Sequence, residues 1–517
     1  MKRLLAILMS LFSIPVFAQE ATETTGTTMD ERIQAFFEPI TAWVEAVVFF
    51  EVSAGGITIP FVLPWLIIGA TVFTFYMGFI NIRGFRHALD VVRGKFDNPN
   101  DAGEVSHFQA LTAALSGTVG VGNIAGVAFA VSIGGPGATF WMIVAGLLGM
   151  SSKFTEVSLG LIYRKENADG SVSGGPMYYL DQGLKERGMA GLGKILAAMF
   201  AVFCIGGSFG GGNMVQINQA TLQLIEVTGG EASVFYGRGW IFGTVIAIIV
   251  GLIIIRGIKS IARVTEKIVP FMVGVYLLGV VIVLGYHFAD IPAAFGSIVS
   301  GAFAPEAFYG GLIGVLIQGF RRAAFSNEAG VGSASIAHSA AKTNEPISEG
   351  IVALLEPFID TVVICTMTAL VIIVTDYGGM GGEATFIAKN GGEIGDISIT
   401  SNAFGSVISW FPTVLAVAVI LFALSTMISW SYYGLKCWTY LFGESKTNEN
   451  IYKVIFCLFV IIGSAISAQA VFGFGDAMIF AMCFPNVLGL YLLMPKVKKA
   501  LNSYMSRVRS GEIKRYS

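Results

Sequence analysis

Charged residues are scarce in this 517-residue chain, at 13%, whereas hydrophobic residues make up 54%. A soluble domain usually carries about 25% charged residues, so the composition excludes an ordinary soluble protein. Apolar segments of about 20 residues, the length that crosses a bilayer as a helix, recur along the whole chain. The sequence therefore predicts an all-α polytopic membrane protein.

Cysteine and histidine are also few, with five and four residues. The cysteines are scattered through apolar segments without a CxxC pair, and the histidines form no HExxH motif. This pattern indicates neither a disulfide framework nor a metal site. An intramembrane enzyme would need a nucleophile–base pair or a metal cluster at one depth, and none is apparent. The GxGxxxG stretch from Gly120 lies in an apolar span without a preceding strand, so it is no dinucleotide motif, and no nucleic-acid partner is expected.

The first residues, MKRLLAILMSLFSIPVFAQE, have the form of a secretory signal peptide. Two basic residues precede a short apolar run that ends in Ala18. We expect a signal peptide over 1–18, cleaved after Ala18; an uncleaved membrane anchor is the alternative. Residues 19–59 are then an extracytoplasmic segment that includes an amphipathic helix.

The apolar segments predict eleven transmembrane helices. Residues 60–106 hold an extra first span and a loop, 107–290 and 291–495 hold five spans each, and 496–517 form a basic cytoplasmic tail. The eleven segments are 61–80, 108–131, 138–161, 195–224, 240–255, 268–288, 309–340, 351–374, 412–440, 451–466 and 471–494.

The distribution of lysine and arginine among the loops tests this arrangement of spans. Most of the 32 basic residues fall in alternate loops and the tail, whereas the remaining loops and the N-terminal segment carry only Arg32, Arg238 and Lys389. Basic loops face the cytoplasm. The distribution therefore predicts a multi-pass protein of the cell inner membrane with a cytoplasmic C-terminus, in contact with membrane lipid.

Two of the predicted spans have glycine-rich centres. One contains LSGTVGVGNIAG from Leu115, and the other contains FSNEAGVGSASIAH from Phe325. Glycine costs about 1 kcal/mol against alanine inside a helix. Five spans separate the two starts, and because five is odd, the second span enters the membrane from the opposite side. This spacing predicts two inverted repeats of five helices, each with one interrupted helix.

Paired interrupted helices point to the binding site of a transporter. Helix ends inside the membrane can bind a carboxylate with free N–H groups, and freed carbonyls can bind Na⁺. Small residues also serve helix packing, which is the alternative interpretation. A channel would need a continuous polar pore, whereas the polar residues concentrate at the two interruptions.

Several longer motifs resemble one known family: LSGTVGVGNIAGVA, GGPGATFWM, GGNMVQINQ, FSNEAGVGSASIAH and STMISWSYYG. They are similar to the alanine or glycine:cation symporter family, the sodium/alanine symporters, which have the LeuT-type fold of the amino acid–polyamine–cation superfamily. The resemblance covers residues 60–495. It implies a secondary active transporter, not an enzyme, that imports alanine or glycine with Na⁺ by alternating access. Coupling to H⁺ through Glu156 or Glu328 is the alternative.

The first interrupted span has no acidic residue between 108 and 131. A substrate amine without a carboxylate would need an anion there, so the site suits a neutral amino acid. Thr118, Gly120 and Gly122 are expected to offer backbone groups to the substrate. Asn123 has two possible roles, orienting either the ligand or the unwound loop.

Amides elsewhere complete the candidate site. Asn213 and Gln216 can accept an ammonium group, or can bond a neighbouring helix. The resemblance favours Gln216 as a substrate contact, with Asn327 a similar candidate. Trp430 is expected to be a pocket wall that excludes long side chains; an interfacial tryptophan is the alternative.

The resemblance also implies a sodium site. Ser425 and Thr426 would bind Na⁺ together with carbonyls near Thr118 and Val121, unless the hydroxyls bond their own helix. Three charged residues at membrane depth, Arg321, Arg322 and Glu328, need partners. We expect a gate or brace with a carboxylate of another span, from among Glu156, Glu356 and Asp360.

Overall fold

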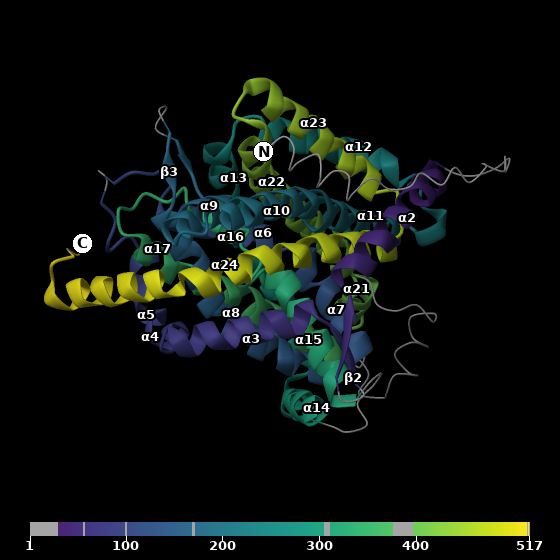
Figure 1. The fold of residues 1–517 in the computed structure, drawn as a ribbon. Coiled ribbons are helices and arrows are strands. Elements are labelled where there is room, and N and C mark those ends of the chain that lie inside the picture. The colour runs from purple at the N-terminus through teal and green to yellow at the C-terminus, as the bar shows by residue number, and fades with distance from the viewer. Residues whose placement is uncertain are drawn as a thin grey trace.

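The computed structural model describes residues 29–54, 57–98, 101–167, 171–303, 311–375, 397–513 and 515. The predicted signal peptide, 1–18, lies outside these residues. Nearly all of the described chain is helical, and the long helices run roughly parallel to one another (Figure 1). Helix α24 (Ala468–Ser510) extends along the whole bundle and packs against α10, α2 and α3.

Helices lie at each of the first four predicted spans. The first and third spans are single helices, the second is interrupted, and the fourth contains a π-helical turn. In order they are α3 (Val62–Tyr76), α6 (His107–Thr118) with η1 (Val121–Asn123) and α7 (Ala125–Gly134), α8 (Gly137–Ile162), and α10 (Ala190–Phe209) with η2 (Gly210–Met214) and α11 (Val215–Val227).

The other seven predicted spans are helical as well. Two of them are composed of several consecutive helical segments. In order they are α12 (Gly239–Ile254), α13 (Ile258–Tyr286), α15 (Gly311–Asn327) with α16 (Ala334–His338), α17 (Pro346–Val352) with α18 (Leu355–Pro357), η5 (Phe358–Cys365) and α19 (Thr366–Val374), α22 (Phe411–Phe442), α23 (Lys446–Gly463), and α24.

Several of these helices are long and apolar enough to cross a membrane. Within the described ranges there are five such helices, and a sixth span if the bent pair α6–α7 is counted as one. Helices α3 and α12 are apolar but shorter, as is the segment Phe288–Phe303. The protein is thus a multi-pass membrane protein, while the count of eleven spans stays a prediction.

The structure also contains a helix that the sequence pattern missed. Helix α14 (Ile291–Phe303) follows the short η4 (Phe288–Asp290) and packs against α8. With 13 residues it is shorter than a bilayer-crossing helix. Because its apolar segment is shorter than the roughly 20 residues that indicate a transmembrane span, the sequence predicted a loop there.

The remaining helices and strands lie toward the two ends of the bundle. Four of them are strands, which form two antiparallel pairs. In the first pair, Glu51 lies opposite Pro60. They are α2 (Met29–Val48), β1 (Glu51–Ala54), β2 (Ile57–Pro60), α4 (Ile80–Arg83), α5 (Phe85–Val92), β3 (Lys165–Glu166), β4 (Val172–Ser173), α9 (Pro176–Glu186), η3 (Gly230–Ala232) and α21 (Ile397–Gly405).

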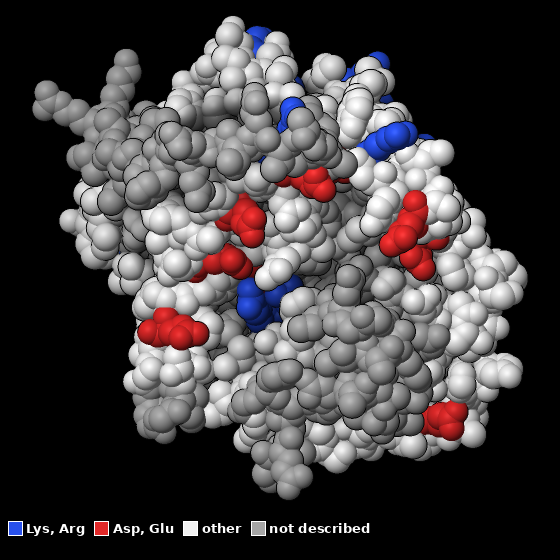
Figure 2. All heavy atoms as spheres, turned by 90° about the vertical axis from the view of Figure 1, so that its right-hand side faces the viewer, with Lys and Arg blue, Asp and Glu red and all other residues white. Residues whose placement is uncertain are grey.

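The two ends of the molecule differ in what they carry. Elements α4, α5, β3 and α17 and the C-terminus gather at one end, whereas α2, β2 and α21 lie at the other (Figure 1). We call these the basic end and the opposite end, because the loops with most lysine and arginine belong to the first. Figure 2 looks onto the opposite end, where a basic patch lies in a hollow with acidic side chains beside it.

The separation of the ends predicts which residues each side of the membrane can reach. Val234 is 71% exposed at the opposite end, and Lys499 is exposed at the basic end. In a Cys457→Ser background, we expect Val234→Cys to react with a membrane-impermeant maleimide on intact spheroplasts. Lys499→Cys should react only after permeabilisation. The reverse pattern would contradict a cytoplasmic basic end.

Candidate functional site

The first interruption is a sharp bend between α6 and α7, at an angle of 61°. Val119 and Gly120 are extended, and one 3₁₀ turn, η1, follows before α7 begins. The side chain of Asn123 closes this loop, because its Oδ1 accepts a hydrogen bond from the Gly120 N–H at 2.8 Å. A Cβ at Gly120 would lie 2.5 Å from Thr426 Oγ1 and 2.9 Å from Gln216 Oε1. Only glycine therefore allows these side chains to approach the unwound backbone.

The second interruption lies between α15 and α16. Glu328, Gly330 and Gly332 all have positive φ, at 56°, 88° and 93°. A left-handed conformation costs a residue other than glycine about 1–2 kcal/mol. Contacts hold Glu328 in it: the carboxylate accepts hydrogen bonds from Trp430 Nε1 at 3.0 Å and from the Ser333 hydroxyl.

A buried polar junction joins the two interruptions. Asn123 Nδ2 donates to Asp360 Oδ1 at 2.6 Å and to Ser326 Oγ at 3.0 Å. The Ser326 hydroxyl in turn donates to Asp360 Oδ2 at 2.8 Å, as does the Thr361 hydroxyl at 2.7 Å. All four side chains are buried. Asn123 is thus hydrogen-bonded both to the unwound loop and to the groups of the second interruption.

A small, partly open cavity lies where the two interruptions meet, and its free space holds about one water molecule. Both interrupted helices contribute to its wall, together with η2, α11, α22 and α24. The lining residues are Gly117, Thr118, Gly122, Gly211, Gln216, Phe325, Ser326, Glu328, Trp430 and Ile479.

Four of the predicted substrate residues, Thr118, Gly122, Gln216 and Trp430, line this cavity. Gln216 Oε1 accepts from the Val121 N–H at 3.1 Å, and its Nε2 donates to the Gly211 carbonyl at 2.9 Å. Both bonds fix the amide against unwound or π-helical backbone. Gly120 lies directly behind, between Gln216 and Thr426.

Two other predicted substrate residues lie away from the cavity wall. Asn213 Nδ2 donates to the Phe456 carbonyl of α23 at 2.8 Å. Asn327 Nδ2 donates to Thr361 Oγ1 at 2.9 Å, and its Oδ1 accepts from the Ala329 N–H. Both amides therefore bond neighbouring structure, the alternative that the sequence left open for Asn213.

The two predicted sodium-binding hydroxyls have different surroundings. Ser425 Oγ donates to the carbonyl of Phe422 in its own helix at 2.9 Å. Thr426 Oγ1 is buried and has no hydrogen-bond partner among the described residues. An unpaired buried hydroxyl is costly, so Thr426 is the better placed of the two to bind an ion beside Gly120.

The two membrane arginines pair with a carboxylate that we did not expect. Asp476 Oδ2, in α24, lies 2.9 Å from Arg321 Nη2 and 2.5 Å from Arg322 Nη2. The Arg322 guanidinium also lies 5.8 Å from the ring centre of Phe325, which lines the cavity. The sequence did carry a signal, because Asp476 is the one acidic residue in its predicted span. The expected partners, Glu156, Glu356 and Asp360, make other contacts.

A wholly buried ion pair is a further feature that sequence reasoning missed. Lys153 Nζ in α8 lies 3.0 Å from Glu356 Oε1, and neither side chain is exposed. Lys153 also interacts electrostatically with Glu328 in the cavity wall. The sequence did contain a sign of this pair, because Lys153 lies inside the predicted apolar span 138–161. Removing one partner of a buried pair leaves an uncompensated charge in the membrane interior.

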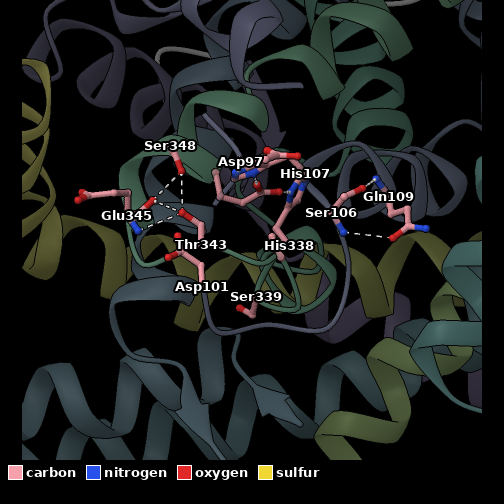
Figure 3. Close-up of polar contacts among 12 residues, drawn as sticks. Asp97, Asp101, Ser106, His107, Gln109, His338, Ser339, Thr343, Glu345 and Ser348 are labelled. Carbon is pink, nitrogen blue, oxygen red and sulfur yellow. Dashed lines mark hydrogen bonds and ion pairs between the residues drawn. The ribbon is translucent and has the colours of Figure 1, made fainter. Parts of the chain in front are cut away.

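Further titratable groups continue from this pair toward the basic end. Glu356 Oε2 lies 3.6 Å from His338 Nε2, and His338 Nδ1 lies 2.5 Å from Glu349 Oε1. The other oxygen of Glu349 bonds His107 Nδ1, and His107 Nε2 lies 3.7 Å from the half-exposed Asp97. Figure 3 shows His107 and His338 on separate elements with Asp97 beside them.

Backbone pairing ties the same region together. Residues before α6 meet residues after α16: the Glu104 N–H donates to the Ala340 carbonyl at 2.8 Å, and the Lys342 N–H donates to the Val105 carbonyl at 2.8 Å. Arg164 donates to the carbonyls of Ala341 and Thr343. The segments at the ends of both interrupted helices are thus joined at the basic end.

A polar site between interrupted helices of a multi-pass bundle is typical of a membrane transporter. Comparison with known sequences gives the family. The sequence profile of the "Sodium:alanine symporter family" matches residues 41–517. The chain therefore belongs to the sodium:alanine symporter family, and it is a cation-coupled amino-acid symporter, not an enzyme.

Two relatives identified by sequence agree with this assignment. "Sodium/alanine symporter AgcS" of Methanococcus maripaludis is 38% identical over 88% of this chain and 96% of its own length. "Probable sodium/glutamine symporter GlnT" of Bacillus subtilis is 31% identical over 85% of this chain and 87% of its own. The solved structure of Mhp1, a nucleobase-cation-symport-1 family transporter, has 13% identity and a TM-score of 0.40 over 71% of this chain and 75% of its own.

The geometry of the first interruption predicts different tolerances for its two glycines. A Cβ at Gly120 collides with Thr426 and Gln216, whereas a Cβ at Gly122 meets Phe325 at 3.6 Å, an ordinary contact. We expect Gly120→Ala to abolish uptake of labelled alanine and Gly122→Ala to retain part of it. Gly122→Val should abolish uptake by filling the cavity. All three variants should insert normally, and equal uptake by Gly120→Ala and the parent would contradict the close approach.

Proposed function

We propose that this symporter imports a small neutral amino acid, alanine or glycine, together with Na⁺ by alternating access. The observation that carries the proposal is the small cavity between the two interrupted helices, which Thr118, Gln216 and Glu328 line together. Because this space is narrow, it favours a small substrate over a large one, and the names of two relatives refer to sodium and alanine.

The cavity wall offers a partner to each end of a zwitterion. The N-terminal end of η1 and α7, beside Thr118 and Gly122, carries the partial positive charge that favours the substrate carboxylate. The Glu328 carboxylate in the wall attracts the substrate ammonium. Gln216 positions the unwound backbone, and the Trp430 indole limits the length of the side chain. Asn213 and Asn327 support the adjoining helices.

Two places at this site suit Na⁺. The first comprises Thr426 Oγ1 and carbonyls of Thr118 and Val121, with Ser425 in a supporting role. The second is the Asp360 carboxylate, for which no ion pair with lysine or arginine is found in the described part of the chain. A buried carboxylate without a cationic side chain favours a bound cation.

The same proposal extends to the architecture and location. Eleven spans comprise an extra first helix and two inverted five-helix repeats with the LeuT-type fold. The repeats cover residues 107–290 and 291–495. The protein lies in the cell inner membrane with its C-terminus in the cytoplasm, in agreement with the basic loops and tail at one end.

Uptake by proteoliposomes tests the proposal directly. Labelled alanine and glycine are offered with an imposed Na⁺ gradient or, separately, an imposed H⁺ gradient. We expect accumulation with the Na⁺ gradient and counterflow in its absence, which a channel does not support. Accumulation with the H⁺ gradient alone would show that H⁺, and not Na⁺, is the driving ion.

Proton coupling is the second candidate, and one observation favours it. The series Asp97, His107, Glu349, His338, Glu356 and Lys153 extends from the surface to the neighbourhood of Glu328. Imidazole and carboxylate groups in contact can pass protons. If protons drive transport, His338→Gln should abolish accumulation while binding of alanine persists.

Variants of the ion site should separate ion binding from substrate binding. An ion that has shed its water needs nearly all its ligands from the protein, so Thr426→Ala should raise the Na⁺ concentration for half-maximal alanine binding by about tenfold or more. Because ion and substrate binding are linked, high Na⁺ should restore most of the alanine affinity. Gln216→Ala should weaken alanine binding even at saturating Na⁺.

Ser425→Ala is the matched control, because it removes a hydroxyl one residue away that already bonds its own helix. We expect a smaller change in Na⁺ dependence than for Thr426→Ala. Titration of Na⁺ at fixed alanine, followed by alanine at fixed high Na⁺, measures both effects. Unchanged Na⁺ dependence in Thr426→Ala would exclude the first ion place and leave Asp360→Asn as the variant to examine.

A further inference from the structure

A second cavity, remote from the transport site, lies at the basic end between α4 and the last third of α24. Its volume is about 300 Å³. Figure 1 shows α3 and α4 beside α24, close to the C-terminus, and α3 packs against α24. Three basic side chains, Arg83, Lys498 and Arg509, line the cavity together with the polar Asn502 and Ser506.

Two of the basic groups lie close together, and none of the three has an acidic partner among the described residues. A Cβ at Gly78 would lie 3.2 Å from Arg83 Nη1 and 3.5 Å from Lys498 Nζ, so the two cations lie within several ångströms of each other. They repel each other electrostatically. In the described ranges, neither they nor Arg509 form an ion pair with a carboxylate. Converging like charges without a counter-charge suit a bound anion.

The helix α24 presents its share of the cavity on one face. Residues 498, 501, 502, 505, 506 and 509 are spaced by three and four, which places them on one side of a helix. A neighbouring basic residue on α24 has an acidic partner. Arg507, on the adjoining face, forms an ion pair with Glu345 at 2.6 Å. Lys498 and Arg509, in contrast, face the cavity and form no such pair within the described ranges.

The rest of the cavity is apolar. Met77, Ile80 and Leu501 are buried in its wall. Just outside, Phe75, Phe79 and Ile82 are exposed, the last at 72%. The basic groups thus lie at the edge of an apolar surface, where α3 ends and the apolar part of α24 gives way to its basic part. A lipid headgroup requires this combination, whereas a free ion needs no apolar surface.

We propose that the cavity between α4 and α24 binds the phosphodiester headgroup of an anionic phospholipid. Arg83 and Lys498 hold the phosphate, and Arg509, Asn502 and Ser506 lie around the headgroup. The acyl chains lie along the exposed apolar side chains of α3 and α4. The lipid thereby neutralises the repulsion between Arg83 and Lys498 and joins the first span to the C-terminal helix.

Lipid titration of the purified full-length protein tests the proposal without any transport measurement. The Tm of the protein in detergent is followed while phosphatidylglycerol, phosphatidylcholine or inorganic phosphate is added. We expect saturable stabilisation by phosphatidylglycerol alone. In the double variant Arg83→Gln/Lys498→Gln, the loss of two charge-assisted contacts should raise the half-saturating concentration about tenfold or more.

The matched control is Arg86→Gln/Lys499→Gln, which removes two exposed charges at the same end but outside the cavity. It should bind phosphatidylglycerol as the parent does. The swap Arg83→Lys/Lys498→Arg keeps both charges and should retain saturable binding, which excludes misfolding as the cause of a loss. Equal loss in the double variant and the control would show only diffuse attraction and overturn the proposal. Equal stabilisation by inorganic phosphate, or by phosphatidylcholine, would also overturn it.

Discussion

The contact on which the transport site depends is the hydrogen bond between Asn123 and Asp360. Through it, the unwound part of the first interrupted helix is fixed to η5, and Ser326 adds the second interrupted helix to the same junction. Unwound backbone inside a membrane survives only where protein groups satisfy it. The junction meets that demand, and the cavity exists because two interruptions are held facing each other.

Most charged side chains in the interior around this cavity form ion pairs. Lys153 balances Glu356 on the side of the basic end, and Arg321 with Arg322 balances Asp476 in α24. Glu328 and Asp360, in contrast, have hydrogen-bond donors as partners but no direct ion pair in the described residues. The site therefore holds two carboxylates without a directly paired cationic side chain in the described part of the chain, and the proposed function uses them to bind an ammonium group and a cation.

The sequence predicted the local features well, because they depend on residue type. Glycine runs marked both interruptions, and Gln216 and Trp430 proved to line the cavity. Features that depend on helix rotation were harder to predict. Asn213 lies in a helix that is buried all round, so its sequence position could not show that it faces α23 rather than the cavity. The pairing of Arg322 with Asp476 joins residues 154 positions apart, and local pattern does not encode such a contact.

The central claim is that the narrow cavity between the interruptions admits a small zwitterion and excludes a large one. Equilibrium binding of glycine, alanine and leucine to the purified protein at saturating Na⁺ tests it most directly. Glycine and alanine should bind with similar affinity, and leucine should bind more than about a hundredfold more weakly, because its side chain exceeds the space below Trp430. Leucine binding as tight as that of alanine would contradict the account.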